Sequence, residues 1–116
     1  MNQSIRVLET YRAHYADPIE ISADAVIELT GRTDLWRGHR WLWAKAPDGR
    51  EGWVPDSLVD LDQGPRCKAK FDYSAAELSC EAGEILTRFA ATHGWSWCAN
   101  GQGSEGWVPD QNLQQI

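Results

Sequence analysis

The chain has 116 residues, and its 17 acidic residues outnumber its 11 Lys and Arg residues, which gives a formal net charge of −6 at pH 7. Hydrophobic residues make up 42% of the chain and seven residues are Trp, a composition that excludes a disordered acidic chain. The acidic balance also argues against a general binder of nucleic-acid backbones, which needs a basic face to release counterions. The length allows one ordinary domain or two very small ones.

In chain order, the first elements predicted are strands. Residues 25–29 form a β-branched and aliphatic run, and residues 41–46 alternate large apolar with smaller or polar side chains. Turn residues follow at 47–49, and a further strand begins at residues 51–55, so this pair of strands is predicted to form a hairpin. Strands at 84–89, 95–100 and 105–109 repeat the pattern, and no window shows a sustained helical period, so helices should be minimal.

The second half of the chain repeats the first. Residues 41–56 and 95–110 align at an offset of 54 without a gap, and nine of these 16 positions are identical. Chance at ordinary residue frequencies gives about one match, so the pattern indicates a duplication. A polar stretch with a Gly-Pro breaker predicts a first repeat at 1–61, a linker at 62–65 and a second repeat at 66–116. About five short strands in each repeat predict an all-β fold of two small barrels in tandem.

No targeting segment or membrane span is predicted. The first eleven residues lack an apolar run of the ~7–15 residues that form the core of a signal peptide, and no stretch approaches the ~18 apolar residues of a span. The cysteines, Cys67, Cys80 and Cys98, are odd in number and sparse, unlike a secreted disulfide framework. A reduced, cytoplasmic protein is therefore expected.

The motifs and their order resemble the Src homology 3 (SH3) family, present twice. In the second repeat, residues 69–73 (AKFDY) are similar to the opening segment of that family, and residues 77–86 are similar to its Glu-Leu-Ser segment, with Cys80 in the place of a Phe. Trp95 matches the first residue of its Trp pair, and residues 106–109 (GWVP) match the segment before its short 3₁₀ turn. The first repeat is more divergent, with residues 7–11, Trp41 and residues 52–55 in the matching positions.

The resemblance implies two five-stranded SH3-like barrels, each with an aromatic groove between its RT and n-Src loops. Such a groove binds proline-rich segments, because a polyproline II peptide is ridged and loses little conformational entropy when flat aromatic rings form slots for its prolines. In the second repeat, the matching ligand contacts are Phe71, Tyr73, Trp95 and Pro109, with Glu77 in the RT loop and Asn112 in the place of the last Tyr. In the first repeat they are Tyr11, Trp41 and Pro55, with Trp36 and Arg37 at the groove edge, while Glu9 and Leu58 replace two aromatic positions.

The other tryptophans and one basic segment have more than one interpretation. Trp43, Trp53, Trp97 and Trp107 are predicted to pack in or across the barrels. Residues 31–40 are predicted to form a loop in which three Arg residues and one His surround Trp36. That loop could recognise a carboxylate or a phosphate through Arg forks, or it could be a solvated loop whose Arg residues pair with nearby acids.

Catalysis and metal binding have little support in the sequence. His93 and Cys98 are close, but strand alternation predicts a buried, inert thiol and no third residue orients the pair. The Cys and His residues lack zinc spacing, so no catalytic residue, no metal and no cofactor are expected. The sequence favours a non-enzymatic adaptor that binds a protein or a proline-rich peptide, with no nucleic acid and no membrane as partner. The alternative is an accessory subunit that docks a larger protein through a Trp-rich face.

Overall fold

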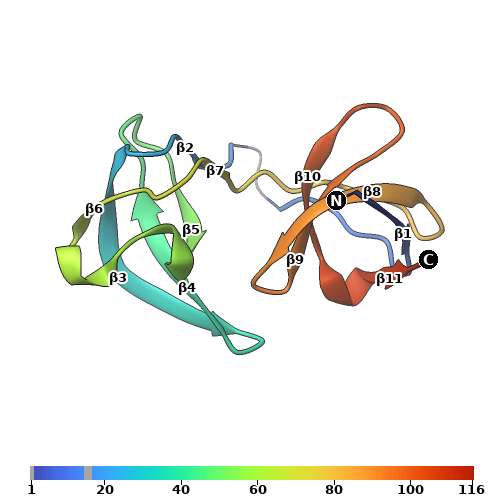
Figure 1. Cartoon of the computed structure of the whole chain (residues 1–116), viewed down its shortest axis with the longest axis horizontal. Helices are drawn as coiled ribbons and strands as arrows, with labels where there is room; N and C mark the ends of the chain where they lie inside the picture. The colour runs from blue at the N-terminus through green and yellow to red at the C-terminus, as the bar shows by residue number, and fades with distance from the viewer. Residues whose placement is uncertain (1, 15–16) are drawn as a thin grey trace. The chain divides into compact units, whose positions relative to one another are not determined.

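The computed structural model describes residues 2–14 and 17–116, and within them the chain forms β-strands and three short 3₁₀ helices, with no α-helix (Figure 1). The strands predicted near residues 25–29, 41–46, 51–55, 84–89, 95–100 and 105–109 are all confirmed. In chain order the elements are β1 (Gln3–Val7), β2 (Glu20–Ile21), β3 (Val26–Trp36), β4 (His39–Lys45), β5 (Glu51–Pro55), η1 (Asp56–Leu58), η2 (Leu61–Gln63), β6 (Arg66–Lys68), β7 (Tyr73–Ser74), β8 (Ile85–Thr92), β9 (Trp95–Ala99), β10 (Glu105–Pro109), η3 (Asp110–Asn112) and β11 (Leu113–Gln115).

The strands form two compact units. Unit 1 contains the described residues 2–14 together with residues 76–116, and unit 2 contains residues 17–75. Each unit is therefore made from both sequence repeats. The division falls inside the two segments that the SH3 resemblance assigns to the RT loops.

Unit 1 takes its first strand from the first repeat. Its sheet has the order β10-β9-β8-β1-β11, in which β1 lies between two strands of the second repeat. Ile5 pairs with Leu86 of β8 on one side and with Gln115 of β11 on the other, in antiparallel register. The segment that follows β1 continues in the same unit, because Tyr11 forms an isolated antiparallel bridge with Cys80.

Unit 2 receives the matching strand from the second repeat. Its main sheet has the order β5-β4-β3-β6, and Ile27 of β3 pairs with Cys67 of β6. A short two-stranded sheet follows, in which β2 pairs with β7 and Ile21 lies opposite Tyr73. The two repeats have thus exchanged their first strands and the adjoining halves of their RT loops.

The compact units of the structure do not coincide with the sequence repeats. The predicted boundaries 1–61 and 66–116 are those of the repeats, whereas each compact unit combines parts of both. The connection between the repeats gives a physical reason. After η1 the chain turns back through η2, where the Cys67 thiol donates to the carbonyl of Gly64 at 3.0 Å and the Lys70 amine pairs with Asp60 at 2.8 Å. This short, folded connection places β6 beside β3, in the position that β1 fills beside β8 in unit 1.

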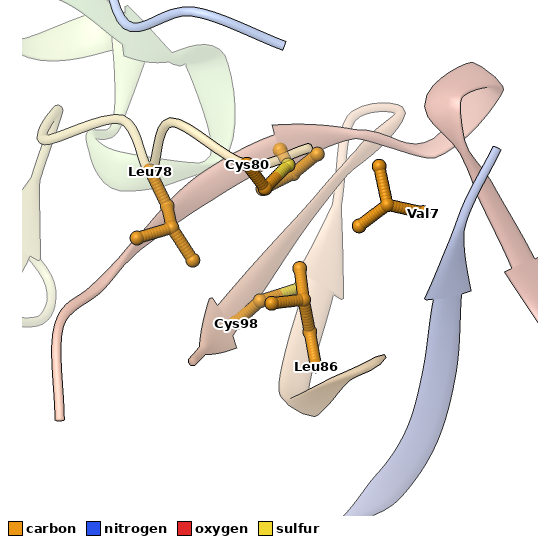
Figure 2. Packing of buried hydrophobic residues seen from close by; sticks show 6 residues of the cluster. Val7, Leu78, Cys80, Leu86 and Cys98 are labelled. Carbon is orange, nitrogen blue, oxygen red and sulfur yellow. The ribbon is translucent and has the colours of Figure 1, made fainter. Parts of the chain in front are cut away.

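Each unit has its own small core, as the alternation of the strands predicts. In unit 1, Val7 from the first repeat packs with the second-repeat residues Leu78, Cys80, Leu86, Cys98 and Val108, and all six side chains are buried (Figure 2). In unit 2, Cys67 and Ala69 from the second repeat are buried together with first-repeat residues that include Ile27, Val54 and Leu58. The exchange therefore extends into the hydrophobic cores.

The prediction that residues 31–40 form a loop is wrong. Most of this segment is strand, because β3 continues to Trp36 and pairs with β4 down to the Trp36–His39 pair. The turn consists of Arg37 and Gly38, with φ angles of 51° and 80°. Two residues with positive φ form the tight hairpin turn whose twist matches that of the flanking strands, so a long loop is not needed.

Candidate functional site

In unit 1, an aromatic pair combines residues from the two repeats. Tyr11 lies next to β1 in the exchanged segment, and Trp95 begins β9. Their ring centroids are 5.9 Å apart with an interplanar angle of 78°, which is the edge-to-face arrangement that aromatic rings prefer. Both side chains are half-buried, and Pro109 of β10 is the direct cross-strand partner of Trp95.

The backbone around Tyr11 is held firmly. The Tyr11 N–H donates to the Cys80 carbonyl at 2.8 Å, and the Cys80 N–H donates to the Tyr11 carbonyl at 2.9 Å. Because Cys80 is buried in the core, these two bonds fix the position from which the Tyr11 ring extends toward Trp95. The Tyr11 ring is thus positioned by the second half of the chain.

His14 joins this site, and sequence reasoning missed it. Its Nδ1 atom shares a hydrogen bond of 3.1 Å with the Tyr11 hydroxyl, and its backbone N–H donates to Glu77 Oε1 at 2.7 Å. The Glu77 side chain is only 10% exposed and also lies 3.3 Å from His14 Nδ1. Glu77, which was predicted as a ligand contact in the RT loop, is therefore already engaged within the chain. The sequence did not indicate His14 as a site residue, because each repeat was expected to form its own barrel.

Asn112 has a structural position. It is buried, its Nδ2 atom donates to the carbonyl of Glu9 at 3.1 Å, and its own carbonyl accepts from the Leu8 N–H at 2.7 Å. The residue predicted as a ligand contact in the place of the last Tyr instead anchors the exchanged segment after β1. Because Asn112 is buried, its amide is not available to a ligand and instead bonds to the backbone of Glu9.

In unit 2, the corresponding aromatic residues are arranged differently. Trp41 is half-buried and lies opposite Pro55 on the neighbouring strand, as Trp95 lies opposite Pro109 in unit 1. Phe71 is 44% exposed, whereas Tyr73 is only 8% exposed and its hydroxyl donates to the Trp53 carbonyl at 3.1 Å. Leu58, which replaces an aromatic position, is fully buried. Tyr73 thus has the same position in its repeat as Tyr11 but a more enclosed environment.

The exchange redistributes the predicted ligand contacts. Phe71 and Tyr73 were expected to share a groove with Trp95, but they belong to unit 2 together with Trp41 and Pro55. Tyr11 belongs to unit 1 with Trp95 and Pro109. The way these aromatic residues combine in space depends on the strand exchange.

Trp36 and Arg37 lie at the tip of the β3–β4 hairpin, where the Arg37 guanidinium is 5.3 Å from the centroid of the Trp36 ring. On another part of unit 2, Arg50 contacts three acidic residues. It lies 2.8 Å from Asp48 of the turn between β4 and β5, and 3.4 Å from Asp17 and 3.7 Å from Glu20 of the RT segment. Hydrogen bonding from Arg50 lowers the pKa of Asp48, so that carboxylate stays ionised beside its partner.

Four further tryptophans, Trp43, Trp53, Trp97 and Trp107, were predicted to pack in or across the barrels. The prediction that they lie inside the cores is wrong. Trp43 and Trp53 form one edge-to-face pair with centroids 5.0 Å apart, and Trp97 and Trp107 form a second one at 5.2 Å. All four are half-buried. In β4 and β9 the residues that alternate with the tryptophans fill the core instead, namely Leu42 and Ala44 in β4 and Cys98 in β9, so alternation directs the indoles to the opposite face of each sheet.

The three cysteines are buried free thiols, as predicted. Burial raises the pKa of each of them, and that of Cys98 rises to about 11. A protonated, enclosed thiol is a poor nucleophile. Within residues 2–14 and 17–116, no group of three or more His, Cys, Asp or Glu side chains is arranged to hold a metal ion.

Comparison with known families agrees with the fold. The model of the variant SH3 domain family matches residues 4–62 and again residues 66–116. The chain therefore belongs to the variant SH3 domain family and carries two copies of its domain in tandem. Domains of this family generally mediate protein interactions and are typically non-catalytic.

Neither the curated proteins nor the solved structures gave a significant match to the chain. In the described part of the chain, no helix has the length and apolar character needed to cross a membrane.

Proposed function

We propose that unit 1 binds an extended, proline-rich segment of a partner protein, and that the segment lies across Tyr11 and Trp95. The observation that carries this proposal is the Tyr11–Trp95 pair, whose half-buried rings meet edge to face at 5.9 Å. Two flat rings at a large angle form the walls of a slot that suits the ridged surface of a polyproline II helix. Pro109, across the sheet from Trp95, is buried, so it has little accessible surface to offer a ligand and the two rings must supply the contact.

The affinity should come mainly from these aromatic contacts. Two acidic residues of unit 1 already have partners in the chain, since the Glu77 carboxylate accepts from the His14 N–H and Glu81 pairs with Arg12. A basic residue of the ligand would have to compete with them. Binding should therefore depend only weakly on salt, because screening acts on exposed charge pairs and not on apolar contacts.

The proposal is tested by titrating the full chain with a mixture of proline-rich peptides while amide chemical shifts are recorded. We expect shifts centred on Tyr11 and Trp95, and a loss of binding in Trp95→Ala. The matched control is Trp41→Ala, which removes the equivalent residue of unit 2 and should leave the unit 1 shifts in place. Unchanged affinity in Trp95→Ala would overturn the assignment.

A pull-down from native extract separates this function from the accessory-subunit alternative. Several weak proline-rich partners agree with the proposal. A single stoichiometric partner that is retained by Trp95→Ala and survives high salt contradicts it. Phe71, Trp41, Trp36 and Arg37 remain predicted contacts of a second site in unit 2. Pro55, which was also predicted as a contact, is fully buried and cannot reach a ligand there.

A further inference from the structure

Trp95, one wall of the proposed slot, lies at the end of its hairpin. It is the first residue of β9 and directly follows the tight turn of His93 and Gly94, whose φ angles are 53° and 82°. Across the sheet it lies opposite Pro109, which has no N–H and cannot donate a backbone hydrogen bond to β9. Because the ends of strands open more readily than their interiors, the direction of the Trp95 side chain depends on contacts outside the ladder.

Unit 2 holds the equivalent tryptophan differently. Its β3–β4 hairpin continues past Trp41 through the pairs Leu35–Arg40 and Trp36–His39 before it turns. Trp41 therefore lies inside β4, with paired residues before and after it along the strand. The unit 1 hairpin ends at the Thr92–Trp95 pair, so it has no such pairs beyond its tryptophan.

Asp110 forms hydrogen bonds on both sides of Trp95. It is the first residue of η3, and its backbone N–H donates to the Gly94 carbonyl at 2.8 Å. Its Oδ1 atom accepts from the hydroxyl of Ser96, the residue that follows Trp95. One residue thus holds the chain immediately before and immediately after the tryptophan. We call Gly94, Ser96 and Asp110 the Asp110 clamp.

The hydroxyl of Ser96 is enclosed between two charged groups. Ser96 has no exposed surface, and a buried hydroxyl without a hydrogen-bond partner costs free energy, so the bond to Asp110 favours a single rotamer of Ser96. Nη1 of Arg88 lies 3.5 Å from the same hydroxyl oxygen, and Nη2 of Arg88 donates to Gln3 Oε1. Since it is buried, Ser96 cannot touch a ligand, and any effect it has on binding must act through another residue.

The barrel does not require these polar residues. At the repeat offset of 54, Ser96 corresponds to Leu42, which is buried in unit 2. Arg88 corresponds to Leu29, which has the same cross-strand position in β3. A leucine cannot form the side-chain bond of the clamp, yet the main sheet of unit 2 has the same order. Buried polar groups seldom stabilise a fold more than apolar residues of similar volume, so their presence in unit 1 points to a role in its site.

We propose that Asp110 is a positioning residue of the unit 1 slot, which fixes the direction of Trp95 through Gly94 and Ser96 and does not itself touch the ligand. This inference rests on the proposed function, because it names what holds one wall of the same slot. A ring that is fixed before the ligand arrives removes an ordering cost from binding, so the clamp raises the affinity for a rigid polyproline II segment. The side-chain part of the clamp is specific to unit 1.

The first test needs no ligand and measures NMR relaxation of the Trp95 indole N–H in the full chain. Asp110→Ala and Ser96→Ala should each lower its order parameter toward the values below about 0.6 that mark flexible groups. Asp110→Asn keeps the backbone N–H and a carbonyl oxygen as acceptor, so it should retain the ordered signal of the unaltered chain. The indole of Trp97, which donates to Glu105 Oε1 at 2.9 Å, is the internal control and should not change.

The second test measures the affinity of each variant for N-acetyl-decaproline amide by isothermal titration. Asp110→Ala and Ser96→Ala should each weaken binding about three- to tenfold, the range expected for the loss of one hydrogen bond. The double variant should bind about as weakly as either single variant, because both remove the same bond. Asp110→Asn should stay within about twofold of the unaltered chain. The probe carries no charge, so direct attraction to the Asp110 carboxylate plays no part.

Leu86→Val is the matched control for stability. It reduces the buried core of unit 1 without altering any residue of the Asp110 clamp. Urea denaturation should show a lower free energy of unfolding, while the Trp95 signal and the affinity for decaproline stay unchanged. Asp110 is exposed, so its variants keep the test decisive if the buried substitution Ser96→Ala folds poorly.

Four outcomes would overturn the proposal. They are an ordered Trp95 indole in both alanine variants, equal effects of Asp110→Asn and Asp110→Ala, an equal loss of affinity in Leu86→Val, and a loss of affinity without any change in the Trp95 signal. If the unaltered chain does not bind decaproline, the proposed function fails for a polyproline ligand. The ligand-free Trp95 signal then still decides whether Asp110 positions the ring.

Discussion

Tyr11 and Trp95 meet edge to face with their ring centroids 5.9 Å apart, although they belong to different sequence repeats. The contact exists because the repeats exchange their first strands, which brings the opening segment of the first repeat onto the sheet of the second. Each aromatic site of this tandem SH3 chain is thus a composite of two repeats.

The composite site predicts which substitutions act together. Tyr11→Ala and Trp95→Ala should each weaken peptide binding by unit 1, and their effects should be coupled by about 0.5–1.5 kcal/mol because the two rings touch. Isothermal titration of the single and double variants measures this coupling. Phe71→Ala is the control, since Phe71 lies in unit 2. Coupling of Trp95 to Phe71 in place of Tyr11 would argue for contiguous barrels.

The strand exchange can be tested with an engineered disulfide. Arg6 pairs with Gln114 across β1 and β11, and both are exposed, so R6C/Q114C should form an intramolecular disulfide. The bond closes a loop of nearly the whole chain and should raise the free energy of unfolding by up to about 4 kcal/mol. Non-reducing mass spectrometry of the digested protein identifies the linked peptides.

A matched pair provides the control for that experiment. If the first repeat formed its own barrel, Arg6 would occupy the position of Lys68, which pairs with Val26. The R6C/V26C variant should therefore remain reduced. A disulfide in R6C/V26C with none in R6C/Q114C would contradict the exchange.

Two equivalent glycines should differ in their tolerance of a methyl group. A Cβ atom at Gly106 would lie 2.7 Å from the backbone carbon of Glu77 and from the backbone nitrogen of Leu78, whereas at Gly52 it would meet the Ile19 side chain at 2.8 Å. Backbone cannot rotate away as a side chain can, so Gly106→Ala should cost about 3 kcal/mol and Gly52→Ala about 1 kcal/mol. Urea denaturation of both variants measures the difference, and equal losses would be inconsistent with these contacts.

Cys98 should make stability fall in alkaline solution. Its pKa is about 11 in the folded chain, raised by burial from about 9.0. Between these values the unfolded thiol loses its proton while the folded one keeps it, so unfolding releases protons and is favoured by rising pH. The free energy of unfolding should therefore be insensitive to this thiol below about pH 9 and decrease from there toward about pH 11. Cys98→Ala should show a flatter decline in the same denaturation series, and an identical pH dependence would contradict the raised pKa.

The strands and the family could be predicted from the sequence because they depend on local signals. The alternation in residues 41–46 and the duplicated hairpin of residues 41–56 and 95–110 fix strand positions without reference to tertiary structure. The extension of β3 to Trp36 was missed because the turn after it requires a positive φ angle at Arg37. Arginine rarely adopts this conformation, so its residue type does not indicate such a turn.

The candidate site could be predicted only in part. Tyr11, Trp95 and Pro109 were identified by their positions in the repeats, but their combination was not. Pairing of β1 with β8 in place of β3 does not change the hydrophobic pattern of any strand, so periodicity cannot distinguish the two arrangements. The positions of His14 and Asn112 follow from this pairing and were not predictable for the same reason.

The exchange of first strands also sets an order of events during synthesis. Residues 17–75 are contiguous and contain every strand of unit 2, so this unit can close as soon as Ala75 has emerged from the ribosome. The strand β1, although it is made first, must wait until β8 and finally β11 at the C-terminus are available to pair with it. The earliest residues of the chain are thus among the last to reach their native partners.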